Sequence, residues 1–422
     1  MFTPSSSFSY TNKSLIKSGH PAADGYKKAS ALSLSSILNL LWLLIGYFCS
    51  IGSSQYQMGL PATSLVPLLL VVSSLLMQQG SEGEMVPAVY VFGDSLVDVG
   101  NNNHLPVSLA KADFPHNGMD FPTNKPTGRF SNGKNAADWL ADKLGLPTSP
   151  PYLAVKSKSP SSFITGVSFA SGGAGIFDGS DQTLRQSIPM TKQMEYYHSV
   201  YQSLIQQMGS SAAQTHLTKS IFAIVIGSND IFDYSNSSSA WKQSTPPQAF
   251  AKLMATALKD HLKQLYLSGA RKFVLAGVGP LGCSPRERLK DSANQDCDQD
   301  HNSLATFYNQ QLKSTLQKLQ SEFGKDFSYS YFDTFSMLYN MILNPAPYGF
   351  REVKAACCGL GDLRAMVPCI PISSYCSDRR DHVFWDMFHP TEAAAQLLID
   401  AFYDGPTGKY TFPTNIKQLI AV

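Results

Sequence analysis

Short apolar runs alternate with longer amphipathic segments along most of the chain. The short runs are rich in aromatic and branched side chains and have the length of buried strands. They cover residues 87–92, 221–226, 272–278 and 328–333. Buried strands that alternate with helices predict a parallel sheet with helices on both of its faces.

Between these runs, apolar side chains recur at spacings of three and four, which predicts amphipathic helices. The helical stripes lie within residues 194–208, 250–265, 304–319 and 391–402. Gly269 and Gly324 follow two of the stripes and are typical helix stops. We interpret the aromatic and methionine residues of these stripes as core faces. Residues 86–412 contain no internal repeat and no long linker, so we expect one domain.

The first 85 residues have a different pattern. They contain two long apolar runs, at residues 31–51 and 65–77. The second run is too short to span a bilayer, and the first is borderline at about 20 residues. We therefore predict that residues 1–85 are a leader with signal-type segments and that residues 86–422 are the globular domain. A signal anchor is the alternative, and translation could begin at Met58, just ahead of the second run.

Composition and charge limit the classes of partner. The chain has 422 residues, of which 43% are hydrophobic and 15% charged, and this suits a globular protein with a sizeable core. The formal net charge is +2 and no cluster of Lys and Arg is visible, so we expect no nucleic-acid partner. We also expect no membrane span in the mature protein. The oligomeric state cannot be read from the sequence.

Cysteine usage favours an oxidising compartment. One cysteine lies in the leader, and the other six could form three disulfides. A Cys283–Cys297 bond would close a short loop, and the cysteines within residues 357–376 could close another, but the pairing stays open. The Cys-x-x-Cys spacing of a zinc site is absent. The sequon at residues 236–238 is a possible glycosylation site, which agrees with secretion.

Polar residues with catalytic potential follow the first predicted strand. Residues 89–92 lead directly into Gly93, Asp94 and Ser95. The serine hydroxyl is thereby placed at the carboxyl end of a strand, where open parallel sheets bind ligands. A simple turn is the alternative for this motif. We interpret Asp94 as shaping the turn by accepting backbone N–H groups, rather than as a second acid.

The other end of the chain supplies Asp386 and His389, three residues apart. A carboxylate at this spacing can hold the imidazole within one turn. Together with Ser95, these residues have the composition of a nucleophilic triad. A metal site would need a third ligand at motif spacing, and none is nearby. We therefore predict catalysis without a cofactor and without a metal ion.

Two further segments could stabilise an oxyanion. Gly172 and Gly173 belong to a glycine run that can aim backbone N–H groups at a ligand, and Asn229 follows the second predicted strand. With the N–H of Ser95, the Gly173 N–H and the Asn229 amide would make three donors. A flexible loop and a helix N-cap are the alternatives for these two segments. The adjacent glycines also leave open which of the two is the donor.

These residues resemble those of a plant-type member of the GDSL esterase/lipase family, within the SGNH hydrolases. The resemblance extends from about residue 86 to about residue 412. The matching positions are Phe92-Gly93-Asp94-Ser95-Leu96, Asp98, Gly100-Asn101-Asn102-Asn103, Gly128-Arg129-Phe130-Ser131-Asn132-Gly133, Ala170-Ser171-Gly172-Gly173-Ala174-Gly175, Gly227-Ser228-Asn229-Asp230, Asp386 and His389-Pro390. One departure is Ser168, where the family usually has Asn.

The resemblance implies a single three-layer α/β/α domain with a mainly parallel, flavodoxin-like sheet. It implies that Ser95 is the nucleophile, that Gly173 and Asn229 help to bind the oxyanion, and that Asp386 and His389 complete the triad. The expected function is that of a secreted serine hydrolase that cleaves acyl esters of small molecules or lipids through an acyl-serine intermediate. In a plant its place would be the cell wall or apoplast. The acyl and alcohol preferences depend on loop shapes that the sequence does not reveal.

Three alternatives to this function are to be weighed against it. An acyltransferase would keep the triad and pass the acyl group to an alcohol. An extracellular binding protein could use the scaffold without turnover, although no triad member is missing. An ordinary α/β-hydrolase would carry Gly-x-Ser-x-Gly at its nucleophile, and no serine of this chain lies in that frame.

Overall fold

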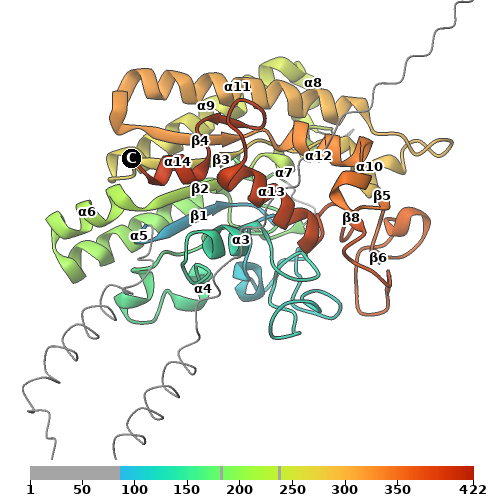
Figure 1. Cartoon of the computed structure of the whole chain (residues 1–422), viewed down its shortest axis with the longest axis horizontal. Coiled ribbons are helices and arrows are strands. Elements are labelled where there is room, and N and C mark those ends of the chain that lie inside the picture. The colour runs from blue at the N-terminus through green and yellow to red at the C-terminus, as the bar shows by residue number, and fades with distance from the viewer. Residues whose placement is uncertain (1–85, 181–183, 236–238) are drawn as a thin grey trace, which may run out of the picture. The chain divides into compact units, whose positions relative to one another are not determined.

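A five-stranded sheet lies at the centre of the computed structural model (Figure 1). Its strands stand in the order β1-β2-β3-β4-β9, with the first four parallel and β9 antiparallel to β4. Their bounds are β1 (Val89–Gly93), β2 (Ile221–Val225), β3 (Lys272–Ala276), β4 (Ser328–Phe332) and β9 (Thr411–Pro413). The four predicted strands are confirmed within two residues at either end. The short edge strand β9 was not predicted.

The structure describes residues 86–180, 184–235 and 239–422. The predictions about the leader and the sequon at residues 236–238 lie outside these ranges. The division at residue 86 therefore stays a prediction. Within the described ranges, no helix combines the length and the apolar character that crossing a membrane requires.

Helices cover both faces of the sheet. The four predicted helical stripes correspond to α5, α9, α11 and α13. The helices are α3 (Ala136–Lys143), α4 (Tyr152–Val155), α5 (Met190–Met208), α6 (Ser210–Lys219), α7 (Ser228–Ser235), α8 (Ala240–Ser244), α9 (Pro247–Leu267), α10 (Pro285–Arg288), α11 (Gln299–Phe323), α12 (Thr334–Leu343), α13 (Glu392–Asp404) and α14 (Ile416–Ile420). Figure 1 shows the long helices α9 and α11 side by side, and α13 beside α3.

Alternate side chains of the strands point to opposite faces and build two different cores. One face is aromatic and packs against α5, α6, α9 and α11. Its side chains include Tyr90, Phe92, Phe222, Phe273 and Tyr331. The other face is made mainly of smaller side chains and packs against α3, α12, α13 and α14. Its side chains include Val89, Val91, Ala223 and Val274. The predicted three-layer α/β/α domain is thus confirmed.

A disulfide-rich segment follows α12 outside the central sheet. It contains two small sheets, in which β5 (Glu352–Ala356) pairs with β8 (His382–Phe384) and β6 (Cys358–Gly359) pairs with β7 (Ser374–Tyr375). Two disulfides pack around the buried indole of Trp385, and a third closes the loop before α11. The three bonds are Cys283–Cys297, Cys357–Cys376 and Cys358–Cys369. They resolve the pairing that the sequence left open.

A buried ion pair joins the segment at residues 128–133 to α3. The Arg129 guanidinium donates two hydrogen bonds to Asp138, at 2.6 and 2.7 Å. The same carboxylate accepts the Asn135 backbone N–H and so caps α3. Both side chains are at least nine-tenths buried, so neither charge can be solvated by water if its partner is lost.

We expect Arg129→Met to lower the free energy of unfolding by about 3–5 kcal/mol, because it leaves the buried Asp138 carboxylate without a positive partner. Urea unfolding of the full chain measures this loss. The control is Asp142→Asn, at a position of α3 whose carboxylate pairs with Lys134 near the surface, and it should cost about 1 kcal/mol or less. Equal losses in the two variants would contradict the importance of the buried pair.

Candidate active site

The first strand ends where its backbone touches the next strand. Gly93, the last residue of β1, has φ +154°, and a Cβ at this position would lie 2.2 Å from the carbonyl oxygen of Val225. Only glycine avoids both the collision and the unfavourable dihedral. The Asp94 N–H then donates to the same Val225 oxygen at 3.1 Å. These contacts fix the turn that carries Ser95 beyond the carboxyl end of the sheet.

A buried glutamine holds this turn from the other side. The Gln193 side chain, on α5, accepts the Gly93 N–H at 2.9 Å and donates to the Gly93 carbonyl at 2.8 Å. It also donates to the Ile188 carbonyl. Gln193 was not predicted as a residue of the site. Its place in the buried stripe with Met190 and Met194 was the available signal, because a polar residue in an apolar stripe needs a buried partner.

The structure brings Ser95, His389 and Asp386 together. Ser95 Oγ lies 2.7 Å from His389 Nε2, although 294 positions of chain separate the two residues. On the other side of the ring, Nδ1 lies 2.8 Å from both carboxylate oxygens of Asp386. The Phe130 ring stacks on the imidazole with a centroid distance of 4.9 Å. Packing and hydrogen bonding together restrict the orientation of the imidazole.

The turn that carries His389 is built by Asp386 itself. Its carboxylate accepts the backbone N–H groups of Phe388 and His389 at 2.9 and 2.8 Å, as aspartate does in tight turns. The Trp385 N–H donates to the His389 carbonyl and closes the turn. The preceding strand is β8, which pairs with β5 in a separate small sheet.

The glycine run that contains Gly172 and Gly173 lies beside the turn that carries Ser95. The Ser171 N–H donates to the Gly93 carbonyl at 3.1 Å, so the residues before Gly172 follow β1 closely. The Gly172 N–H donates to Asp98 Oδ2 at 3.0 Å. Gly173 has φ +83°, and its N–H makes no hydrogen bond to any described residue. Of the two adjacent glycines, Gly173 is therefore the one whose N–H is available to a ligand.

Buried polar side chains hold the glycine run in place. Besides Gly172, the Asp98 carboxylate accepts the backbone N–H groups of Gly100 and Asn101, both at 2.8 Å. The Asn102 side chain donates to the Gly172 carbonyl at 2.8 Å. The Asn101 side chain donates to the backbone carbonyl of Ser168, also at 2.8 Å. This support uses the backbone at position 168, so it does not depend on the unusual serine side chain there.

Asn229 lies in the first turn of α7. Its amide donates to the Ala174 carbonyl at 2.9 Å, so the side chain contacts the glycine run instead of capping its own helix. The second amide hydrogen has no acceptor among the described residues. The neighbouring Asp230 accepts the backbone N–H groups of Ile176 and Phe177 at 2.8 and 3.0 Å. The start of α7 is thereby tied to the segment that contains Gly173.

A family model matches this arrangement. The GDSL-like lipase/acylhydrolase model covers residues 89–402, a range that contains all of the site residues described in this section. The chain belongs to this family. It is 49% identical to a GDSL esterase/lipase of Arabidopsis thaliana over 80% of this chain and 90% of the relative. A second Arabidopsis GDSL esterase/lipase is 38% identical over 80% of this chain and 92% of its own length. The chain is a carboxylic ester hydrolase by this membership.

Burial changes the electrostatics of three carboxyl groups of the GDSL domain. Burial raises the pKa of Asp94 to about 7, although the Leu96 N–H donates to Oδ1 and His389 lies nearby. Asp94 Oδ2 is buried and has no hydrogen-bond partner within the described residues. Burial also raises the pKa values of Asp98 and Asp230 to about 6, against the effect of the N–H groups that they accept. The loops of the site are thus held by buried carboxyl groups that are shielded from solvent.

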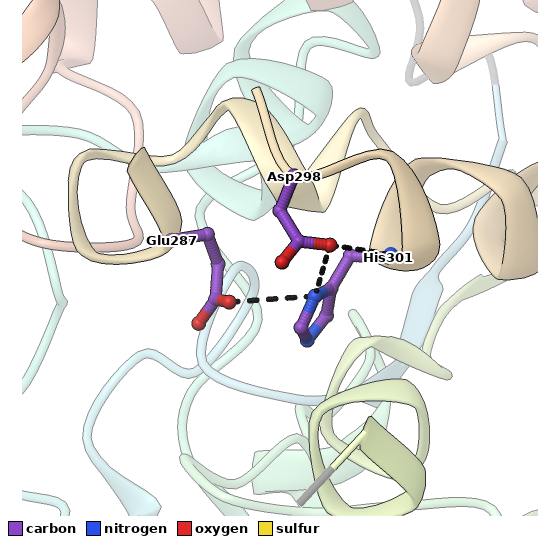
Figure 2. Close-up of side chains that lie close together, drawn as sticks. All are labelled: Glu287, Asp298 and His301. Atoms are coloured by element: carbon purple, nitrogen blue, oxygen red, sulfur yellow. Dashed lines mark hydrogen bonds and ion pairs between the residues drawn. The ribbon is translucent and has the colours of Figure 1, made fainter. Parts of the chain in front are cut away.

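One group of side chains in the described part of the GDSL domain has the composition of a metal site. Figure 2 shows Glu287, Asp298 and His301 pointing toward one another. Their ligand atoms all lie within 4.8 Å of one another. The Lys290 ammonium lies 2.6 Å from Glu287 Oε2 and 3.3 Å from Asp298 Oδ2, so a positive charge already occupies the space between the carboxylates. The cluster is better explained as a support for its segment, in which the Arg286 N–H donates to the turn before His389.

We expect Asp94→Asn to flatten the dependence of stability on pH. A carboxyl group whose pKa is raised in the folded state contributes fully to the free energy of unfolding below its unfolded pKa of about 3.9. This contribution is lost as the pH rises to about 7, the pKa of Asp94 in the folded state. The effect of the variant should be on the order of 1–4 kcal/mol between pH 4 and pH 8, since one pKa unit corresponds to about 1.4 kcal/mol.

Urea midpoints across this pH range measure the effect. The comparison of the wild type with Asp94→Asn at pH 4 is the control, because the side chain of residue 94 is then neutral in the folded state of both proteins. Parallel stability curves from pH 4 to pH 8 would show that the Asp94 carboxyl is not the group that titrates.

Proposed function

We propose that this chain is a secreted serine hydrolase that cleaves acyl esters through an acyl-serine intermediate. The contact of 2.7 Å between Ser95 Oγ and His389 Nε2, with Asp386 behind the ring, is the observation that carries the proposal. A serine, an imidazole and a carboxylate in this order form the minimal set for nucleophilic acyl transfer.

The protonation of His389 follows from its neighbours. An ionised carboxylate only accepts hydrogen bonds, so Nδ1 carries the hydrogen that points to Asp386. Nε2 is then the unprotonated nitrogen and accepts the Ser95 hydroxyl. As the hydroxyl oxygen attacks the ester carbonyl, Nε2 takes its proton, and Asp386 stabilises the resulting imidazolium.

The negative charge that develops on the carbonyl oxygen would be held by three donors. These are the N–H of Ser95, the N–H of Gly173 and the free amide hydrogen of Asn229. The N–H groups of Ser95 and Gly173 make no hydrogen bond within the described residues, so both are available without rearrangement. Fixed donors of this kind stabilise a transition state more than its ground state.

The cycle is completed by proton return. His389 Nε2 protonates the departing alcohol, which leaves the acyl group on Ser95. A water molecule then takes the place of the alcohol, gives one proton to His389 and attacks the acyl carbonyl. The bond between the acyl carbon and Ser95 Oγ breaks, His389 returns the proton to Oγ, and the acid is released. If an alcohol takes the place of water, the same groups perform acyl transfer, and product analysis distinguishes the two reactions.

Secretion is supported by the three disulfides and by the leader pattern. Disulfides persist in oxidising compartments, and the two bonds around Trp385 stabilise the segment just before the Asp386 turn. Two signal-type apolar runs precede the domain. An extracellular enzyme with an ester substrate is therefore the function that best fits both parts of the chain.

Ser95→Ala tests the proposed function. We expect at least about a thousandfold loss of p-nitrophenyl acetate hydrolysis, because the nucleophile is removed while the oxyanion donors remain. Labelling by a fluorophosphonate, read by intact mass, should disappear as well, and the urea midpoint should stay near that of the wild type. Ser321→Ala, at an exposed position of α11, is the matched control and should keep full activity. Undiminished turnover in Ser95→Ala would refute the proposal.

Asp98→Asn tests the support of the oxyanion donors. One oxygen that now accepts N–H groups becomes an NH₂ group, so the loop that carries Gly172 and Gly173 loses part of its anchor. We expect kcat to fall by about ten- to a hundredfold with little change in KM, since the donors act mainly in the transition state. A variant that raises KM alone would assign Asp98 to substrate binding instead.

A further inference from the structure

Two adjacent residues of the glycine run are glycines for different reasons. Gly173 has φ +83°, a conformation that other residues rarely adopt. The backbone of Gly172 lies outside this left-handed region, so its conformation alone would admit other residues. A Cβ at Gly172, however, would lie 2.7 Å from both Cε2 and Cζ of Phe130 and 2.9 Å from Asn102 Nδ2. The missing side chain at this position therefore makes room mainly for the Phe130 ring.

The Phe130 ring contacts the proposed base as well as the glycine run. Its face stacks on the His389 imidazole, with a centroid distance of 4.9 Å and an angle of 30° between the ring planes. Its edge, at Cε2 and Cζ, faces Gly172. A phenylalanine side chain has only two rotatable torsions, so a ring that is held on two sides fixes the separation of the groups that it touches.

The backbone that carries Phe130 is anchored on both sides of this residue. The residue before it forms the buried ion pair with α3 that is described above. After it, the Asn132 side chain accepts the Glu392 N–H at 2.9 Å, and the Glu392 carboxylate accepts the Lys134 N–H, also at 2.9 Å. Glu392 is the first residue of α13 and follows His389 closely in the chain. The Phe130 ring is thus held in place relative to the segment that carries the base.

The base and the glycine run belong to separate hydrogen-bonded units. In the described ranges, no hydrogen bond joins the turn at residues 386–389 to residues 171–175. The indirect connection passes through Ser95, which lies 2.7 Å from His389, and through Gly93, whose carbonyl accepts the Ser171 N–H. Packing on the Phe130 ring is a direct connection between the two units.

We infer that Phe130 is a positioning residue that couples the base to an oxyanion donor. Its face sets the orientation of the His389 imidazole. Its edge sets the place of the peptide that joins Gly172 to Gly173, and this peptide carries the Gly173 N–H. The inference rests on the proposed function and adds to it a residue that acts through the catalytic groups.

Such coupling affects turnover more than substrate binding. A shift of about 1 Å in a catalytic group can lower the rate about a hundredfold. If the Phe130 ring is displaced, the base and the oxyanion donor are displaced together, because both are packed against it. Both groups act mainly in the transition state, so the loss should appear in kcat and leave KM nearly unchanged.

The first test is Phe130→Leu in the full-length protein, which keeps an apolar side chain but lacks the far edge of the ring. We expect kcat for p-nitrophenyl acetate to fall about tenfold, with KM within about twofold and the urea midpoint near that of the wild type. The control is Phe335→Leu, the same change at a half-buried position of α12 where the ring contacts Tyr339, and it should keep full activity. An unchanged kcat in Phe130→Leu would overturn the inference, and so would a rise in KM alone, which would assign Phe130 to substrate binding.

The second test approaches the same contact from the glycine run. Gly172→Ala should lower kcat about a hundredfold, because the added methyl group displaces the Phe130 ring and shifts the Gly173 N–H. In the double variant Phe130→Leu/Gly172→Ala the collision with the ring is absent, so kcat should lie within about threefold of that of Phe130→Leu alone. The control is Gly279→Ala, whose Cβ would meet Leu338 at an ordinary contact distance of 3.5 Å, and it should stay within about twofold of the wild type.

The outcomes separate this inference from the proposed function. Two independent residues would multiply their losses to about a thousandfold in the double variant, and this result would overturn the coupling even though ester hydrolysis stands. Should Gly172→Ala fail to fold, Phe130→Leu decides the inference alone by its kcat and KM. Failure of the proposed function would appear separately, as full activity of Ser95→Ala on acetate.

Discussion

The close approach of β1 and β2 at Gly93 is the constraint on which the site depends. The missing Cβ lets the backbone pass the Val225 carbonyl, and the Gln193 side chain then occupies the backbone groups of Gly93 on the other side. Because both sides of this residue are fixed, the turn after it has little freedom, and the Ser95 hydroxyl is directed toward His389. The glycine run is positioned by the same residue, since the Ser171 N–H donates to Gly93.

Buried carboxylates connect the remaining parts of the site. Asp98 holds the loop before Gly173, Asp230 holds the loop after it, and Asp386 holds the turn of His389, in each case by accepting two or more backbone N–H groups. A buried carboxylate is costly unless it is hydrogen-bonded, so each loop is stable only in the conformation that supplies those N–H groups. Burial still raises the pKa values of Asp98 and Asp230, which shows that the desolvation is not fully offset.

Local patterns predicted the elements, but contacts between distant segments could not be predicted from them. The four parallel strands and their helices follow from apolar periodicity, and Ser95 and Asn229 follow from the polar residues at strand ends. The strand before His389 pairs with a partner in the disulfide-rich segment, and no periodicity indicates that partner. The choice between Gly172 and Gly173 depends on which N–H a single carboxylate oxygen, Oδ2 of Asp98, accepts. Gln193 has a helical position like its apolar neighbours, and only its chemistry distinguishes it.

The two faces of the sheet differ in the size of their side chains and in how completely they are packed. A strand alternates its side chains, so one sequence can carry aromatic residues toward one layer and small residues toward the other without changing its backbone. The aromatic face, with Phe92, Phe222 and Phe273, fills its layer and stabilises the sheet. The opposite face can then remain incompletely filled, because the fold does not rely on it alone.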